Sequence, residues 1–99
     1  MEIIENHMDS ISALCAKHKV SKLFVFGSIL EKSFSKESDI DLIVNFDNVD
    51  LMNYADNYFD FKFSLENLFK REVDLLEEQA IKNPYLRESI DSSKKLIYG

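Results

Sequence analysis

Two short strand-like runs constrain this chain more than any other feature, because residues suited to binding and catalysis stand where the runs meet. Val20–Phe26 is rich in β-branched and aromatic residues and stops at Gly27-Ser28. Asp39–Phe46 alternates apolar and polar side chains with the period of a strand. If the two strands pair antiparallel, the turn after the first and the start of the second meet at the same edge of the sheet.

The pair Gly27-Ser28 predicts a tight turn that can hold phosphate. Gly27 has no Cβ, so it adopts backbone angles closed to other residues and lets a ligand approach the main chain. Ser28 is expected to cap a following helical turn, whose unpaired N–H groups and serine hydroxyl form a seat for phosphate oxygens. A Gly-Ser pair alone is usually only a loop, and its position at a strand end is what favours function.

Asp39 and Asp41 are candidate metal ligands. Side chains two residues apart in a strand lie on the same face, about 6 to 7 Å apart at the backbone, so both carboxylates can converge on one hard cation. Mg²⁺ fits best, since it takes one or two carboxylates together with substrate phosphates. Asp-x-Asp alone is usually a solvated strand start, but here it follows a candidate phosphate turn.

Asp74 is a candidate third carboxylate. It lies inside the apolar run of another short strand-like segment, Arg71–Leu76, where an acid needs a partner or a function. On a strand beside Asp39 and Asp41 it can share a metal or accept a proton from an attacking hydroxyl, as in two-metal phosphoryl transfer. The alternative is a partly exposed acid of an edge strand, paired with Arg71 or a lysine.

The amino-terminal segment predicts an amphipathic helix over residues 2–18. Its apolar face holds Ile4, Met8, Ile11, Leu14 and Cys15. Cys15 is therefore expected to be a buried structural thiol rather than a nucleophile. Neither His7 nor His18 has metal-ligand spacing, and both are interpreted as surface or helix-end residues.

A longer helix is predicted over residues 50–70, and it is unusually rich in aromatic residues. Leu51, Tyr54, Tyr58, Phe61, Leu65 and Leu68 follow the helical period, whereas Met52, Phe59, Phe63 and Phe69 lie outside that stripe. These side chains form either a wide core face or a surface that anchors a partner or lines a nucleotide pocket. Asn83-Pro84 predicts the cap and first turn of a short helix to about Asp91, and Lys95–Tyr98 predicts a last edge strand.

Length and charge limit the possible functions. Ninety-nine residues are expected to form one domain, 1–99, with a single core and no second substrate-binding domain. The net charge of −6 argues against stable nucleic-acid binding and favours a basic protein partner. Without a membrane-length apolar run or a signal-peptide pattern, and with one cysteine, the protein is expected to be cytoplasmic.

Gly27-Ser28-x10-Asp39-Ile40-Asp41, followed by Val73-Asp74-Leu75 and the closing Lys95–Gly99, resembles the minimal nucleotidyltransferases of the polymerase beta superfamily. The resemblance covers most of the chain. It implies an α/β (α+β) nucleotidyltransferase fold with a small mixed sheet flanked by helices. It also implies metal-dependent transfer from ATP, with two Mg²⁺ ions, catalytic carboxylates at Asp39, Asp41 and Asp74, and triphosphate binding at Gly27 and Ser28.

Stand-alone members of this family are typically antitoxins paired with a HEPN-domain ribonuclease toxin, to which they attach AMP at a tyrosine. The resemblance implies this role here. The chain departs from the family at Glu31 and Lys32, where an arginine and then a glycine are common. Glu31 places a negative charge near the expected phosphate site, and Lys32 can offset it.

Two other functions fit the sequence. The chain can be an antitoxin that neutralises its partner by binding alone, which the departure at Glu31-Lys32 keeps open. It can also transfer a nucleotide to a small-molecule hydroxyl such as that of an aminoglycoside, although no acceptor domain is present.

Overall fold

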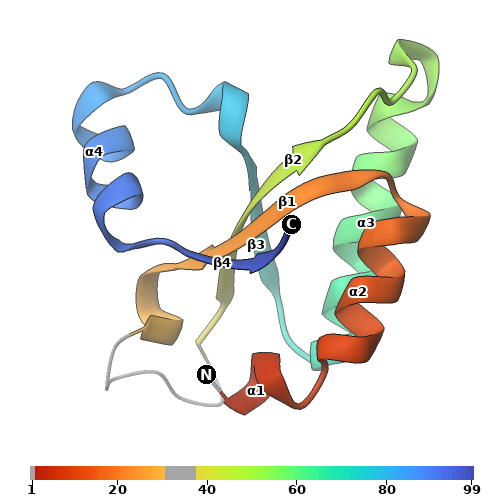
Figure 1. Cartoon of the computed structure of the whole chain (residues 1–99), viewed down its shortest axis with the longest axis horizontal. Coiled ribbons are helices and arrows are strands. Elements are labelled where there is room, and N and C mark those ends of the chain that lie inside the picture. Colours follow the sequence, from red (N-terminus) through yellow and green to blue (C-terminus); the bar gives the residue numbers. More distant parts are fainter. Residues whose placement is uncertain (1, 31–37) are drawn as a thin grey trace.

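The computed structural model describes residues 2–30 and 38–99. Within these ranges the chain forms a four-stranded sheet in the order β3-β2-β1-β4 (Figure 1). The strands are β1 (Val20–Phe26), β2 (Ile40–Phe46), β3 (Val73–Glu77) and β4 (Lys95–Tyr98). β1 pairs antiparallel with both β2 and β4, whereas β2 and β3 run parallel. The expected mixed sheet, the antiparallel pairing of its first two strands and the closing edge strand are confirmed.

Helices flank the sheet on both sides. They are α1 (Glu2–Glu5), α2 (Met8–Lys17), α3 (Tyr54–Phe69) and α4 (Pro84–Ser93). Figure 1 shows α2 and α3 side by side on one side of the sheet and α4 on the other. α3 supplies the crossover that the parallel strands β2 and β3 require. None of the helices in the described ranges has the length and apolarity needed to cross a membrane.

The helix predicted over residues 2–18 is divided into α1 and α2. The His7 N–H bonds the Ile4 carbonyl, only three residues back, at 3.1 Å, and the His7 Nδ1 lies 2.7 Å from the Ile3 carbonyl. These contacts close α1 in a tight turn that a helical period does not predict. The expected burial of Cys15 is confirmed, and desolvation raises the pKa of its thiol to about 12.

The helix predicted over residues 50–70 is shorter, since a 3-10 turn, η2 (Leu51–Asn53), precedes α3. Leu51, expected on the apolar stripe, is 87% exposed in that turn, whereas Phe69, expected outside the stripe, is buried. The helix ends at Phe69, and the next residue, Lys70, has a left-handed φ of 59° that directs the chain toward β3. The predicted cap of α4 is confirmed, because the Asn83 Oδ1 accepts hydrogen bonds from the N–H groups of Tyr85 and Leu86.

One face of the sheet carries the main apolar core. The alternation predicted for β2 is observed, with Ile40, Leu42 and Val44 fully buried on this face. They pack with side chains from β1, β3, α2 and α3, namely Leu23, Val25, Val73, Leu75, Ile11, Cys15, Phe61, Leu65 and Phe69. Burial of this apolar surface is the main force that holds α2 and α3 against the sheet.

The other face of the sheet is covered only in part, by α4. Ile43 of β2 and Ile90 of α4 are buried there, apart from the main core. Glu78, in the 3-10 turn η3 (Glu78–Ala80), accepts hydrogen bonds from Asn45 of β2 and Arg87 of α4. The Glu78 carboxylate thereby ties α4 to the sheet beside Asn45.

Side chains of α3 close part of the outer edge of β3. The Val73 N–H donates to the Glu66 Oε2 at 3.0 Å, and the Tyr58 hydroxyl donates to the Leu75 carbonyl. The β2–β3 register directs these two backbone groups away from β2. Because such groups on an edge strand otherwise invite pairing with another strand, α3 both protects β3 and fixes its position.

His18 lies at the end of α2, as predicted, but it is buried rather than on the surface, with 2% of its area exposed. Its Nδ1 lies 2.7 Å from the Leu14 carbonyl and its Nε2 lies 2.7 Å from the Asp60 Oδ2. The hydrogen bond from His18 lowers the pKa of the Asp60 carboxyl. This contact joins α2 to α3 at the end of the helical layer.

We predict that Asp60→Asn lowers the melting temperature at pH 7. Because the folded-state pKa of Asp60 is lowered, its stabilising effect is present above the unfolded pKa of about 3.9 and is lost as pH falls through the folded value. The difference between wild type and variant should therefore shrink below about pH 4. Thermal unfolding across pH measures it, with the exposed Glu88→Gln as control. A pH-independent difference for Asp60→Asn would contradict the assignment.

Candidate functional site

Gly27 ends β1 in a conformation that favours glycine. Its φ is +74°, and it begins the 3-10 turn η1 (Gly27–Leu30). A Cβ at this position would overlap the Asp41 Oδ2 and lie 3.2 Å from the Asp41 Cγ. The expected sharp turn is confirmed, and the group that approaches the backbone most closely is a carboxylate of the same site. Ser28 is the second residue of η1 and does not precede the turn as a cap.

Asp41 stands where three strands meet. In the antiparallel pair its Cα partner is Phe26, the last residue of β1, and in the parallel pair its partner is Asp74 of β3. Asp39 is exposed and immediately precedes β2. The Arg71 guanidinium donates to the Ser38 carbonyl at 2.9 Å, and the Ile40 N–H donates to the Glu72 carbonyl at 3.1 Å. These bonds hold the start of β2 against the chain that enters β3.

Asp74 lies on the same face of the sheet as Asp41. It is exposed between the buried residues Val73 and Leu75, and its strand runs in register beside β2. Neighbouring strands lie about 4.8 Å apart, so the two carboxylates are adjacent across the strands. The ion pairs of Lys62, Arg87 and Lys94 go to Glu66, Glu78 and Asp91.

Two pockets flank this row of residues on opposite sides. On the β1 side, a pocket of about 350 Å³ lies between Gly27 and α4, lined by Phe26, Gly27, Leu30, Leu86, Ser89, Ile90 and Ser93. On the β3 side, a pocket of about 410 Å³ lies beside α3, lined by Asp39, Lys62, Glu66, Glu72, Val73 and Asp74. Gly27 and Asp74 therefore line different pockets.

The carboxylate set suits a hard cation by its chemistry, because it offers only oxygen ligands on adjacent strand ends. Across residues 2–30 and 38–99, however, no three His, Cys, Asp or Glu side chains already form a metal-binding group. The backbone brings Asp39, Asp41 and Asp74 to one end of the sheet, and their side chains must still converge to share an ion. Glu31 and Lys32 lie outside the described residues.

Several residues of the site were not singled out from the sequence. Lys62 and Glu66 form an i,i+4 ion pair with a nitrogen–oxygen distance of 3.5 Å, and both line the pocket beside Asp74. Their spacing was visible in the sequence, but only the packing of α3 against β3 places them at the site. The α4 residues that line the other pocket had no sequence signal for this position.

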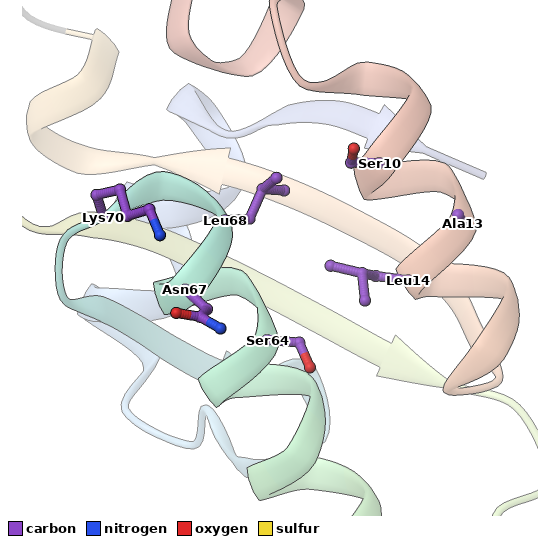
Figure 2. Close-up of a pocket in the computed structure, with 7 residues that line it drawn as sticks. All are labelled: Ser10, Ala13, Leu14, Ser64, Asn67, Leu68 and Lys70. Carbon is purple, nitrogen blue, oxygen red and sulfur yellow. The ribbon is translucent and has the colours of Figure 1, made fainter.

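A third pocket lies away from the aspartates, between α2 and α3. It is lined by Ser10, Ala13, Leu14, Ser64, Asn67, Leu68 and Lys70 (Figure 2). Figure 2 shows Leu14 reaching from α2 into the space beside α3. None of the predicted site residues lines this pocket, which belongs to the helical layer on the opposite face of the sheet.

Comparison with known proteins shows the family and the fold. The family profile described as "Polymerase beta, Nucleotidyltransferase" matches residues 9–99. Two Methanocaldococcus jannaschii proteins named as protein adenylyltransferases are similar. MJ1379 is 34% identical over 97 residues, covering 98% of this chain and 91% of the relative. MJ0128 is 37% identical over 82 residues, covering 83% and 79%.

Solved structures share the fold. A minimal nucleotidyltransferase superposes with a TM-score of 0.76 at 28% identity, covering 95% of this chain and 92% of the other. A toxin–antitoxin complex with AMP-PNP matches with a TM-score of 0.70 at 21% identity, covering 93% and 73%. A complex of a tri-AMPylated Shewanella oneidensis HEPN toxin with an MNT antitoxin matches with a TM-score of 0.65 at 19% identity, covering 96% and 71%.

The mixed sheet, its flanking helices and the acidic strand ends define a nucleotidyltransferase. This chain belongs to the polymerase beta nucleotidyltransferase family. The family resemblance expected from Gly27-Ser28 and Asp39-Ile40-Asp41 is confirmed.

We predict that Gly27→Ala lowers the free energy of unfolding by about 1–3 kcal/mol, through left-handed strain and overlap with the Asp41 carboxylate. In an Asp41→Ala background the overlap with the carboxylate is absent, so the cost should fall by about 1 kcal/mol. Urea unfolding of wild type, both single variants and the double variant measures this coupling. Strictly additive effects would show that Gly27 and Asp41 do not constrain each other.

Proposed function

We propose that this chain transfers AMP from ATP to a tyrosine hydroxyl of a HEPN-domain ribonuclease and acts as its antitoxin. The observation that carries the proposal is the register that sets Asp41 between the Gly27 turn and Asp74. Family membership supports nucleotide transfer, and the names of the two archaeal relatives support a protein acceptor. The fold shared with antitoxins of HEPN toxins suggests the kind of partner.

Each predicted site residue has a role in this proposal. The Gly27-Ser28 turn holds the triphosphate, since Gly27 keeps the backbone accessible at the end of β1. Asp39 and Asp41 would hold one Mg²⁺, and Asp74 would contribute to holding a second. When bound, these ions neutralise charge on the phosphates and lower the pKa of the acceptor hydroxyl.

The transfer itself requires alignment and removal of one proton. The acceptor oxygen forms a bond to the α-phosphorus of ATP while the bond from that phosphorus to the bridging oxygen breaks. Pyrophosphate leaves, and the hydroxyl proton passes to the carboxylate of Asp74. Asp74 suits this step because it is exposed at the site, whereas Asp41 is half-buried against Gly27.

We predict that Asp39→Asn, Asp41→Asn and Asp74→Asn each lower AMP transfer by at least about a hundredfold, because each removes a carboxylate from the reacting centre. The chain is incubated with ATP and a HEPN-domain ribonuclease as the candidate acceptor. Intact-mass spectrometry then counts the AMP units attached to that protein. Asp47→Asn, an exposed carboxylate beyond the opposite end of β2, is the matched control and should retain wild-type transfer.

The same experiment separates the proposal from neutralisation by binding alone. If the partner gains no AMP and Asp39→Asn with Asp41→Asn still neutralises it, the enzymatic antitoxin role fails. Transfer to an aminoglycoside but not to the protein would instead indicate a small-molecule acceptor.

A further inference from the structure

Two aromatic side chains of α3 are exposed and stack on each other. Phe59 is 50% exposed and Phe63 is 56% exposed. Their ring centroids lie 5.9 Å apart with an interplanar angle of 30°. The rings of Tyr58 and Phe59 form a T-shaped contact with a centroid distance of 5.0 Å. A stacked aromatic pair in water offers a large apolar contact at small entropic cost, as binding hot spots do.

The aromatic pair is continuous with the candidate active site. Phe63 lines a pocket with Glu66, Asn67, Lys70, Arg71 and Glu72. Glu66 and Glu72 also line the adjoining pocket, which contains Asp39 and Asp74. We call this surface the acceptor groove, and it consists of Phe59, Phe63, Glu66, Glu72, Asp39 and Asp74.

The direction of the reaction favours this side for the acceptor. In phosphoryl and nucleotidyl transfer the attacking and leaving oxygens lie roughly in line through the phosphorus. In the proposed function the triphosphate rests on the Gly27 turn, at the β1 side of Asp41. The acceptor hydroxyl must then arrive from the β3 side, where Asp74 and the acceptor groove lie.

The charges of the groove are unevenly distributed. Its inner end is bordered by four carboxylates, those of Asp39, Glu66, Glu72 and Asp74. The ammonium of Lys62 also lines this end, 3.5 Å from the Glu66 carboxylate. The aromatic end has Lys70 and Arg71 close by. The inner end therefore attracts cations, whereas the aromatic end offers apolar contact.

We propose that the acceptor groove binds a segment of the partner protein in which the acceptor tyrosine is flanked by basic residues, with an apolar residue placed to contact Phe59 and Phe63. This inference rests on the proposed function, and it adds the surface and the acceptor sequence that the site selects. The basic residues lie beside Glu66 and Glu72, the inner carboxylates that have no proposed role in metal binding, and the apolar residue covers the aromatic pair.

Fluorescence anisotropy with a short labelled peptide tests this surface. The peptide carries one tyrosine with two lysines on one side and a leucine on the other, and its matched partner has glutamates in place of the lysines. We expect the lysine peptide to bind about tenfold more tightly, because the groove and the whole chain, with a net charge of −6, are acidic. Equal binding of the two peptides would overturn the inference.

Two pairs of exposed apolar residues provide matched variants. Phe59→Ser with Phe63→Ser should weaken binding of the lysine peptide about tenfold. Leu51→Ser with Met52→Ser, at residues 87% and 88% exposed in η2 before the other end of α3, should leave it unchanged. Equal losses from both pairs, or no loss from the first, would contradict the inference. Phe63→Ser alone repeats the test if the first pair unfolds.

Because binding is measured without ATP, this test is separate from the test of AMP transfer. Selective peptide binding without AMP transfer to any protein would leave the docking surface intact and remove the proposed function. Normal AMP transfer with no contribution from Phe59 and Phe63 to peptide binding would remove the docking surface and leave the proposed function intact.

Discussion

The contact between the Gly27 backbone and the Asp41 carboxylate is the constraint on which the site depends. A Cβ at Gly27 would occupy the position of the Asp41 carboxylate, so glycine at the end of β1 sets where that side chain lies. Asp41 is in turn opposite Phe26 on one side and Asp74 on the other. One left-handed glycine therefore leaves room for the Asp41 carboxylate where the ends of the three strands meet.

One face of the sheet carries the main apolar core, and the other carries the candidate site. The face beneath α2 and α3 carries the main apolar core, and burial of that surface stabilises the sheet. On the face beneath α4, Ile43 and Ile90 are buried, and Asn45 and Arg87 donate hydrogen bonds to Glu78. The ion pair between Arg87 and Glu78 is partly exposed, so it contributes little stability. Partial cover leaves the Asp41 and Asp74 end of that face beside two pockets, which in the proposed function give the nucleotide and the acceptor separate approaches.

Local signals predicted much of the fold. β1 and β4 have the predicted bounds, and Asn83 caps α4 as expected, because strand composition and capping act within a few residues. The sequence predicted less where residues far apart in the chain come into contact. His18 is buried because Asp60 of α3 and the Leu14 carbonyl surround its ring, and Phe69 is buried because it shares the inner face of α3 with Phe61 and Leu65. The contact between His18 and Asp60 is not visible in the local helical period.

The sequence by itself determined which residues are candidates for the chemistry and on which face of each strand they lie. Asp41 projects opposite to Ile40 and Leu42 because side chains alternate along a strand whatever that strand packs against. Only the tertiary structure decided that Asp74 stands beside Asp41, that Glu66 and Lys62 join them, and that Phe59 and Phe63 remain exposed nearby. The register of two parallel strands depends on how the intervening helix packs, and this packing depends on contacts between residues far apart in the chain.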